Sequence, residues 1–350
     1  MPGPKNTNKN QKKNKNLEEN KLTLNAQLGS LFMQLPREMR DEIYPHLFFS
    51  TRLVWGHRAL GRIDQLRITS APNALALLRS CRQVRAEIGN TWLQQVLFVF
   101  EDPNSMLDKL ANIPTTTLAL IRYARISGET DSIYYRTSQA LKLLPGLALN
   151  RLTILGPRDH EVSYQTLSML VRHGAGWKEL YYLSHNSAFL AYPAGWQRAL
   201  EARDGTNSGA SVAIYTANAP RCPGAVLDPA TRVAFTQTLP AGCDLDTYGT
   251  FEDAALMKHG EREKEVLVVV KRGRGVEYAE KPGLPYLEDG DIREKMPGKT
   301  WKEIKAALAW SDDEDDDYFG LGVDEREPSM VDKYAHVDDY VWPPLHFSNV

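Results

Sequence analysis

The sequence predicts an α/β protein in which an N-terminal helical element precedes a degenerate stack of strand and helix units, with disordered, charged termini. Three observations predict this class. The 350 residues are 42% hydrophobic, which suffices for a sizeable core. Apolar strand-like runs alternate with amphipathic helical segments through the middle of the chain. Polar and charged residues gather at both ends, where little apolar surface is available for burial.

Residues 1–26 are predicted to be a disordered basic tail. The run KNTNKNQKKNKN alternates Lys, Asn and Gln almost without apolar side chains, so burial cannot offset the entropy lost on ordering. The alternative is a tether for nuclear import or nucleic acid, but Asn dilutes the lysines and no Arg accompanies them. We therefore do not expect nucleic acid as a partner.

The second predicted segment, residues 27–102, begins with a helix in LPREMRDEIYPHLF (35–48). Apolar side chains recur there at every fourth residue and so line one helical face. They are Leu35, Met39, Ile43 and Leu47. Pro36 suits the first turn, where its missing N–H costs nothing. Pro45 removes a main-chain hydrogen bond, so we expect the helix to kink or end near Tyr44.

A second helix is predicted over NALALLRSCRQVRAEIGNTW (73–92), with Asn73 as its N-cap. Its apolar side chains fall on one side of the helix. They are Leu77, Leu78, Cys81, Val84, Ile88 and Trp92. The run QVLFVFED follows at once, and its Val and Phe residues indicate a buried strand that ends at Asp102.

Residues 103–310 are predicted to form an α/β domain with a repeating strand and helix unit. The strand-like runs YARIS, LTILG, LYYLS and AIYTA begin at residues 123, 152, 180 and 213, so the unit recurs every 28 to 33 residues. Helical segments lie between these runs. Both a leucine-rich-repeat-like stack and a parallel βαβ sheet produce this period, because each unit buries its apolar face against the next. The spacing leaves both open.

The predicted domain ends with a strand in KEVLVVVKRG and a helix in GKTWKEIKAALAW, for which Thr300 is the expected N-cap. Residues 311–350 are predicted to be an acidic, mostly disordered tail, with twelve acids against Arg326 and Lys333. This tail either keeps the protein soluble or binds basic partners. Ser311 is a phosphorylation candidate, because the acids of SDDEDDD suit a kinase with a basic substrate groove.

No residue set in the chain specifies a reaction, so we expect no enzymatic activity, cofactor or metal. MPGKT (296–300) resembles the end of a phosphate-binding loop, but Arg293 stands where that motif needs its first glycine. Cys81, Cys222 and Cys243 show neither a disulfide framework nor metal-ligand spacing. No run approaches the roughly eighteen apolar residues of a membrane span, and the polar start differs from a secretory signal. We expect a cytoplasmic or nuclear protein with no membrane partner.

The pair LPREMRDEIYPHLF and ALLRSCRQVRAEI resembles F-box-like segments of fungal proteins, of the form L-P-x-E-x-R-x-x-I-Y followed by L-L-x-x-C-R-Q-x-x-x-E. The resemblance implies a helical element that binds the adaptor Skp1 of a cullin-based ubiquitin ligase, while the following repeats bind a protein substrate. The adaptor-binding residues it implies are Leu35, Pro36, Met39, Ile43 and Leu47. The packed second helix would contribute Leu78, Cys81 and Val84.

Three functions therefore stay open. The first is a protein-interaction module that serves as the substrate-recognition subunit of a Skp1-cullin-F-box ubiquitin ligase. The second is an interaction scaffold that works without this adaptor, in which case both N-terminal helices would simply cap the α/β core. The third is an enzyme of an unrecognised α/β type, which would require a concave pocket with convergent polar groups.

Overall fold

The computed structural model describes residues 30–49, 51–55, 74–127, 133–157, 159–184, 186–192, 195–217, 235–239, 264–280 and 292–312. The chain forms two compact units, residues 1–46 and residues 47–350, and their boundary lies inside the helix α3 (Arg37–Phe49). The predicted disordered tails lie outside the described residues, except for Ser311 and Asp312. The same holds for Asn73, Cys222 and Cys243.

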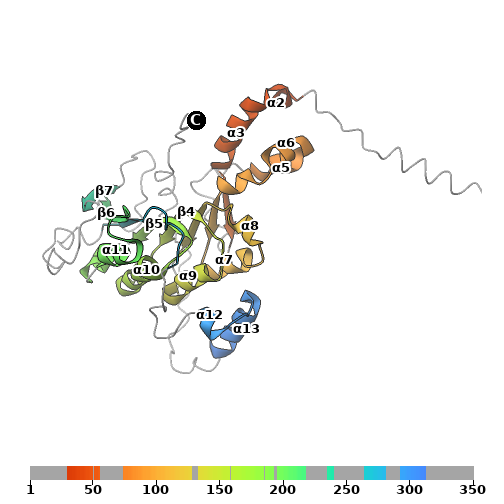
Figure 1. Cartoon of the computed structure of the whole chain (residues 1–350). Coiled ribbons are helices and arrows are strands. Elements are labelled where there is room, and N and C mark those ends of the chain that lie inside the picture. The colour runs from red at the N-terminus through yellow and green to blue at the C-terminus, as the bar shows by residue number, and fades with distance from the viewer. Residues whose placement is uncertain are drawn as a thin grey trace, which may run out of the picture. The chain divides into compact units, whose positions relative to one another are not determined.

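The second unit contains one mostly parallel sheet, which confirms the α/β class (Figure 1). The described strands are β1 (Arg52–Trp55), β2 (Leu97–Phe100), β3 (Tyr123–Ser127), β4 (Leu149–Leu155), β5 (Trp177–Ser184), β6 (Ser211–Ala217), β7 (Phe235–Leu239) and β8 (Val266–Lys271). Strands β1 to β5 are parallel and follow one another in chain order. Strand β8 lies between β5 and β6 and is antiparallel to both, and β7 is antiparallel to β6.

Some helices lie between these strands in the sequence, whereas others come before β1 or after β8. The helices are α2 (Leu31–Gln34), α3, α5 (Leu77–Ser80), α6 (Arg82–Ile88), α7 (Pro103–Leu110), α8 (Thr115–Leu118), α9 (Ile133–Lys142), α10 (His160–His173), α11 (Trp196–Asp204), α12 (Ile292–Lys295) and α13 (Trp301–Asp312). Short 3₁₀ helices occupy Ala74–Ala76, Thr91–Gln94 and Ala188–Ala191. Helices α7, α9, α10 and α11 cover one face of the sheet (Figure 1). Helical crossovers connect neighbouring parallel strands, and such crossovers are right-handed as a rule.

An apolar row crosses the sheet on the helix-covered face. Ile126, Ile154, Tyr182 and Val268 are neighbours in the register of β3, β4, β5 and β8, and each is completely buried. Tyr182 shows which face this is, because its hydroxyl donates to the Ser163 carbonyl of α10 at 2.9 Å. Burial of such branched and aromatic side chains between the sheet and the helices stabilises the unit.

The opposite face carries a row of charges near the start of β4 and β5. Arg151, Glu179 and Lys271 are neighbours in the register of β4, β5 and β8. Glu179 lies 3.6 Å from the Arg151 guanidinium and 3.8 Å from the Lys271 ammonium. The Arg151 guanidinium also stacks on the Tyr181 ring at 4.3 Å. These alternating charges tie three strands together across the sheet.

Helix α3 was predicted to kink or end near Tyr44, and it does not end there but continues through Pro45 to Phe49. Proline removes only one hydrogen bond of the helix, and the next turn still forms. Thr51 then closes the helix, since its N–H donates to the Phe48 carbonyl at 3.0 Å and its hydroxyl donates to the Leu47 carbonyl at 2.8 Å.

The predicted helix over residues 73–92 was wrong as a single element. Cys81 has an extended backbone, with φ −148° and ψ 130°, so the described part of this segment divides into α5 and α6. The Ser80 hydroxyl donates to the Leu77 carbonyl at 2.8 Å and so competes with continuation of the helix. Strand β1 was not predicted.

The sheet also differs from a simple succession of repeats. The predicted strand at residue 213 corresponds to β6, but β6 does not pair with β5. Strand β8 fills the place between them, and it comes from the chain about fifty residues after β6. The last described segment then crosses back, so that α12 lies beside α9 and α13 lies beside α7.

Candidate partner-binding surface

The first unit holds its two helices together by contacts of its own. The Arg40 guanidinium of α3 donates to the Leu35 carbonyl at 2.5 Å and to the Met33 carbonyl at 3.3 Å. The rings of Phe32 and Tyr44 meet edge to face, with centroids 5.9 Å apart. Arg40 thereby binds two carbonyl groups in and directly after the last turn of α2, where a helix leaves carbonyl groups without a partner inside the helix. The segment from α2 to α3 is thus a small helical hairpin held by one arginine and two aromatic rings.

Two apolar side chains project from α3 toward solvent. Met39 is 50% exposed and Ile43 is 39% exposed, and they lie one turn apart on the same face. Leu31 of α2 is 80% exposed. These three are the large apolar side chains that the described residues expose most, apart from Tyr278 in the second unit. We name Met39 and Ile43 the α3 docking face.

The other residues predicted to bind a partner differ in their solvent exposure. Leu35 and Leu47 are half-buried, and Pro36 is exposed just before the first turn of α3. The buried side of α3 is formed by Arg40, Tyr44 and Phe48, a stripe displaced by one residue from the predicted one. The sequence therefore identified a face of α3 that is left in part to solvent. An exposed apolar patch of this kind can mark a site where another molecule binds.

The residues that the predicted second helix would contribute are distributed over α5, α6 and the break between them. Leu78 is half-buried, and Val84 is buried at 1% exposure. Cys81 lies between the two helices as a half-buried free thiol. The break at Cys81 means that these three side chains do not share one continuous helical face.

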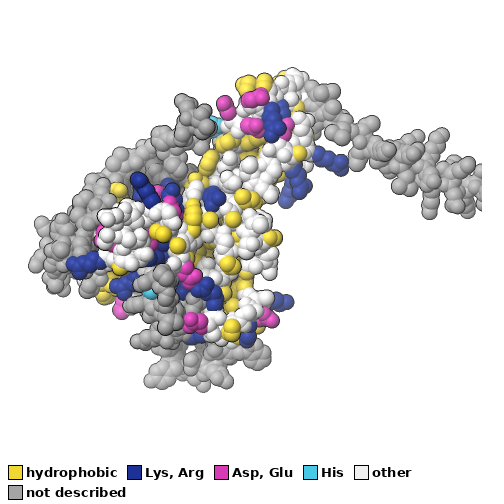
Figure 2. Space-filling model, in the orientation of Figure 1, with side chains coloured by type: hydrophobic (Ala, Val, Ile, Leu, Met, Phe, Trp, Pro, Cys, Tyr) yellow, Lys and Arg dark blue, Asp and Glu magenta, His cyan; other side chains and the backbone are white. Residues whose placement is uncertain are grey.

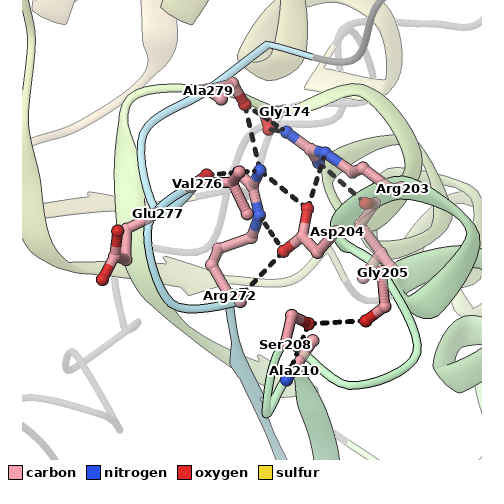
Figure 3. Close-up of polar contacts among 12 residues, drawn as sticks. Gly174, Arg203, Asp204, Gly205, Ser208, Ala210, Arg272, Val276, Glu277 and Ala279 are labelled. Atoms are coloured by element: carbon pink, nitrogen blue, oxygen red, sulfur yellow. Dashed lines mark hydrogen bonds and ion pairs between the residues drawn. The ribbon is translucent and has the colours of Figure 1, made fainter.

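A buried ion network around Asp204 and Arg272 lies in the second unit (Figure 3). Asp204, the last residue of α11, accepts from Arg272 Nε at 2.7 Å and from Arg272 Nη2 at 2.9 Å. It also accepts from the Gly273 N–H at 2.8 Å. Arg272 stacks over the Trp177 ring at 5.3 Å. The side chains of Asp204 and Arg272 are each 1% exposed.

Arg203 completes this network by binding main-chain carbonyl groups. Its guanidinium donates to Val171 at 2.8 Å, to Ala279 at 3.0 Å and to Gly174. Burial, together with the nearby charge of Arg272, lowers the pKa of Arg203 to about 9, and Asp204 opposes this shift. The network fastens the chain after β8 to the ends of α10 and α11. Its donors are directed at the protein's own carbonyl and carboxylate oxygens, as in a structural cluster.

A second polar group lies between β5 and α10. The hydroxyls of Ser163 and Tyr182 are 2.9 Å apart, and the Ser184 hydroxyl is 3.5 Å from that of Ser163. Burial raises the pKa of Tyr182 well above its usual value, which keeps the phenol neutral. A neutral phenol in contact with hydroxyls does not supply the base that activates a serine nucleophile.

Two further residues singled out from the sequence, Thr300 and Ser311, lie at the start and near the end of α13. The helix begins at Trp301, directly after the expected N-cap Thr300, whose N–H and hydroxyl both donate to Glu303 at 2.7 Å. Ser311 lies in the last turn of the same helix. The described residues contain no group of three or more His, Cys, Asp or Glu placed to hold a metal ion. In the same part of the chain, no helix has the length and apolarity required to cross a bilayer.

Neither a protein-family model, nor a curated protein, nor a solved structure matches this chain.

Proposed function

We propose that the chain is a non-enzymatic protein-interaction module, in which the α3 docking face binds a Skp1-like adaptor and the second unit recognises a protein substrate. The observation that carries the proposal is the exposure of Met39 and Ile43 on a helix that also has a buried side. A helix that inserts into a groove uses apolar anchors three or four residues apart. Met39 and Ile43 have this spacing.

The hairpin geometry supports the proposal because it orders the docking face before a partner arrives. Arg40 and the Phe32–Tyr44 ring pair hold α2 against α3 without using Met39 or Ile43. A pre-ordered helix pays less conformational entropy on binding than a segment that must fold. The substrate would then be recognised by the second unit, where β1 to β5 succeed one another as they would in a repeat stack.

Binding to a purified Skp1-like adaptor, measured by isothermal calorimetry with the full chain, tests this function. Ile43→Asp places a charge in the apolar contact and is expected to weaken binding roughly tenfold or more. Ala306→Asp is the matched control, since it adds the same charge at an exposed position of α13. Failure of the unsubstituted chain to bind the adaptor would remove this function.

An adaptor-independent scaffold is the second candidate, and the break at Cys81 favours it. The resemblance to F-box-like segments implies one continuous second helix, whereas α5 and α6 are separated by an extended residue. Affinity purification from the native source distinguishes the two candidates. A scaffold would co-purify with a partner that is lost on Ile43→Asp, in the absence of a Skp1-like adaptor.

A further inference from the structure

Two carboxylates border the α3 docking face. Glu38 and Glu42 each directly precede one of its apolar residues, so they form a second row along the same helix. Both are exposed. Figure 2 shows acidic and apolar side chains next to one another over α2 and α3. The face therefore has an apolar row and a negative row side by side.

Neither carboxylate has a hydrogen-bond or ion-pair partner among the residues that the structure describes. Asp41, three residues after Glu38, is different because it lies 3.4 Å from the Arg37 guanidinium one turn earlier. Two like charges one turn apart repel each other and weaken a helix. The negative row thus lacks the compensation that α3 gives to its other acid.

We propose that the partner of the α3 docking face has an apolar groove bordered on one side by Lys or Arg residues, which pair with Glu38 and Glu42. This inference rests on the proposed docking function and adds the charge of the partner. Apolar contact would supply most of the affinity, whereas the charges would set the orientation of the helix and the rate of association.

The test measures association of the full chain with a purified Skp1-like adaptor by surface plasmon resonance at several salt concentrations. The variant Glu38→Lys/Glu42→Lys should weaken binding about tenfold, mainly through the association rate, and the loss should shrink as salt increases. Glu38→Gln/Glu42→Gln removes the charges without reversing them and should give a smaller loss. The control Glu161→Lys/Glu294→Lys reverses two exposed acids of α10 and α12. Circular dichroism checks that α3 remains folded.

The outcomes separate this inference from the proposed function. If the adaptor binds the unsubstituted chain and Ile43→Asp abolishes binding, docking stands. Unchanged or tighter binding by Glu38→Lys/Glu42→Lys would then overturn the basic border alone. A loss equal to that of the control pair would also overturn it, because the effect would follow from net charge and not from position. If the unsubstituted chain does not bind, the same salt series is run with the partner that co-purifies through Ile43.

Discussion

Asp204 and Arg272 form a buried two-point ion pair, with 2.7 Å between Oδ2 and Nε and 2.9 Å between Oδ1 and Nη2. The pair connects the end of α11 to the residue after β8, which are far apart in the sequence. Arg272 also donates to the carbonyl groups of Val276 and Ala279 at 3.0 Å. One carboxylate thus fixes the course of the chain as it leaves the sheet (Figure 3).

Replacing Asp204 with Asn should destabilise the second unit by about 3 to 5 kcal/mol, because Arg203 and Arg272 would remain buried without a counter-charge. Urea unfolding followed by circular dichroism measures this loss. Arg293→Gln is the control, since Arg293 and Glu280 form an ion pair in which both side chains are more than 40% exposed, and the change leaves Glu280 in place beside the buried Lys142. That change should cost less than about 1 kcal/mol. Equal losses for the two variants would contradict a special role for Asp204.

Helix α13 should detach from α7 in acid. Asp108 of α7 accepts from Trp301 Nε1 at 2.6 Å and from Lys305 Nζ at 2.7 Å. Partial burial would raise the pKa of Asp108, but the hydrogen bonds from Lys305 and Trp301 outweigh it and place the pKa below its ordinary 3.8. A carboxyl group whose pKa is lowered by folding stabilises the folded state above pH 3.8, and this contribution is lost as the pH falls through the lower value. Hydrogen exchange of α13 at a series of pH values below 5 measures the loss.

The pKa of Glu303 is also lowered, so its contribution must be separated from that of Asp108. The Thr300 N–H and hydroxyl donate to Glu303 and lower its pKa. Asp108→Asn should therefore leave part of the pH dependence of α13 exchange, and Asp108→Asn/Glu303→Gln should remove it. Persistence of the full dependence in the double variant would show that other groups control the docking of α13.

Most strands could be predicted because each is defined by a local pattern. The runs that begin at residues 123, 152, 180 and 213 fall on strands β3, β4, β5 and β6, and only Gly156 lies beyond its strand. Their partners could not be predicted, since pairing depends on contacts between distant segments. Strand β8 can lie between β5 and β6 because its continuous Val run can be buried on both faces of the sheet. The sequence does not indicate between which strands it is placed.

The candidate partner-binding surface could also be predicted only in part. A four-residue apolar spacing identifies a helical face, but it does not say whether the protein's own core or another molecule covers it. Arg40 decides this for α3, because its guanidinium is satisfied by carbonyl groups of Met33 and Leu35 and its stem is buried. From the sequence alone, the Arg40 side chain would be expected to be exposed to solvent. The break at Cys81 likewise depends on the extended backbone of one residue inside a good helical pattern.

Gly156 sits where an added methyl group would clash. A Cβ there would lie 2.7 Å from the Tyr182 hydroxyl, 3.0 Å from the Ser163 hydroxyl and 3.0 Å from the Leu183 carbonyl oxygen. Gly156→Ala should therefore destabilise the second unit by about 1 to 3 kcal/mol, measured by urea unfolding. In Gly156→Ala/Tyr182→Phe, the shortest contact is removed, so the combined loss should be less than the sum of the single losses. Strict additivity would show that the Leu183 main chain, and not Tyr182, causes the clash.

Pro45 should weaken α3 between the docking face and the second unit. It lies inside the helix, where it lacks the N–H that would donate to the carbonyl of the residue four positions earlier. Pro45→Ala restores this donor and should slow hydrogen exchange of the amides after Met39, corresponding to about 1 to 3 kcal/mol of helix stability. The gain is limited because proline also restricts the unfolded chain.

Pro36→Ala is the matched control for this measurement, because Pro36 stands before the first turn and its missing N–H leaves no helical hydrogen bond unmade. Exchange in α3 should then change little. Binding through Met39 and Ile43 should be retained in Pro45→Ala, since both side chains precede Pro45 in α3 and keep their spacing. Faster exchange in Pro45→Ala would mean that packing of the proline ring stabilises α3 more than the restored hydrogen bond does.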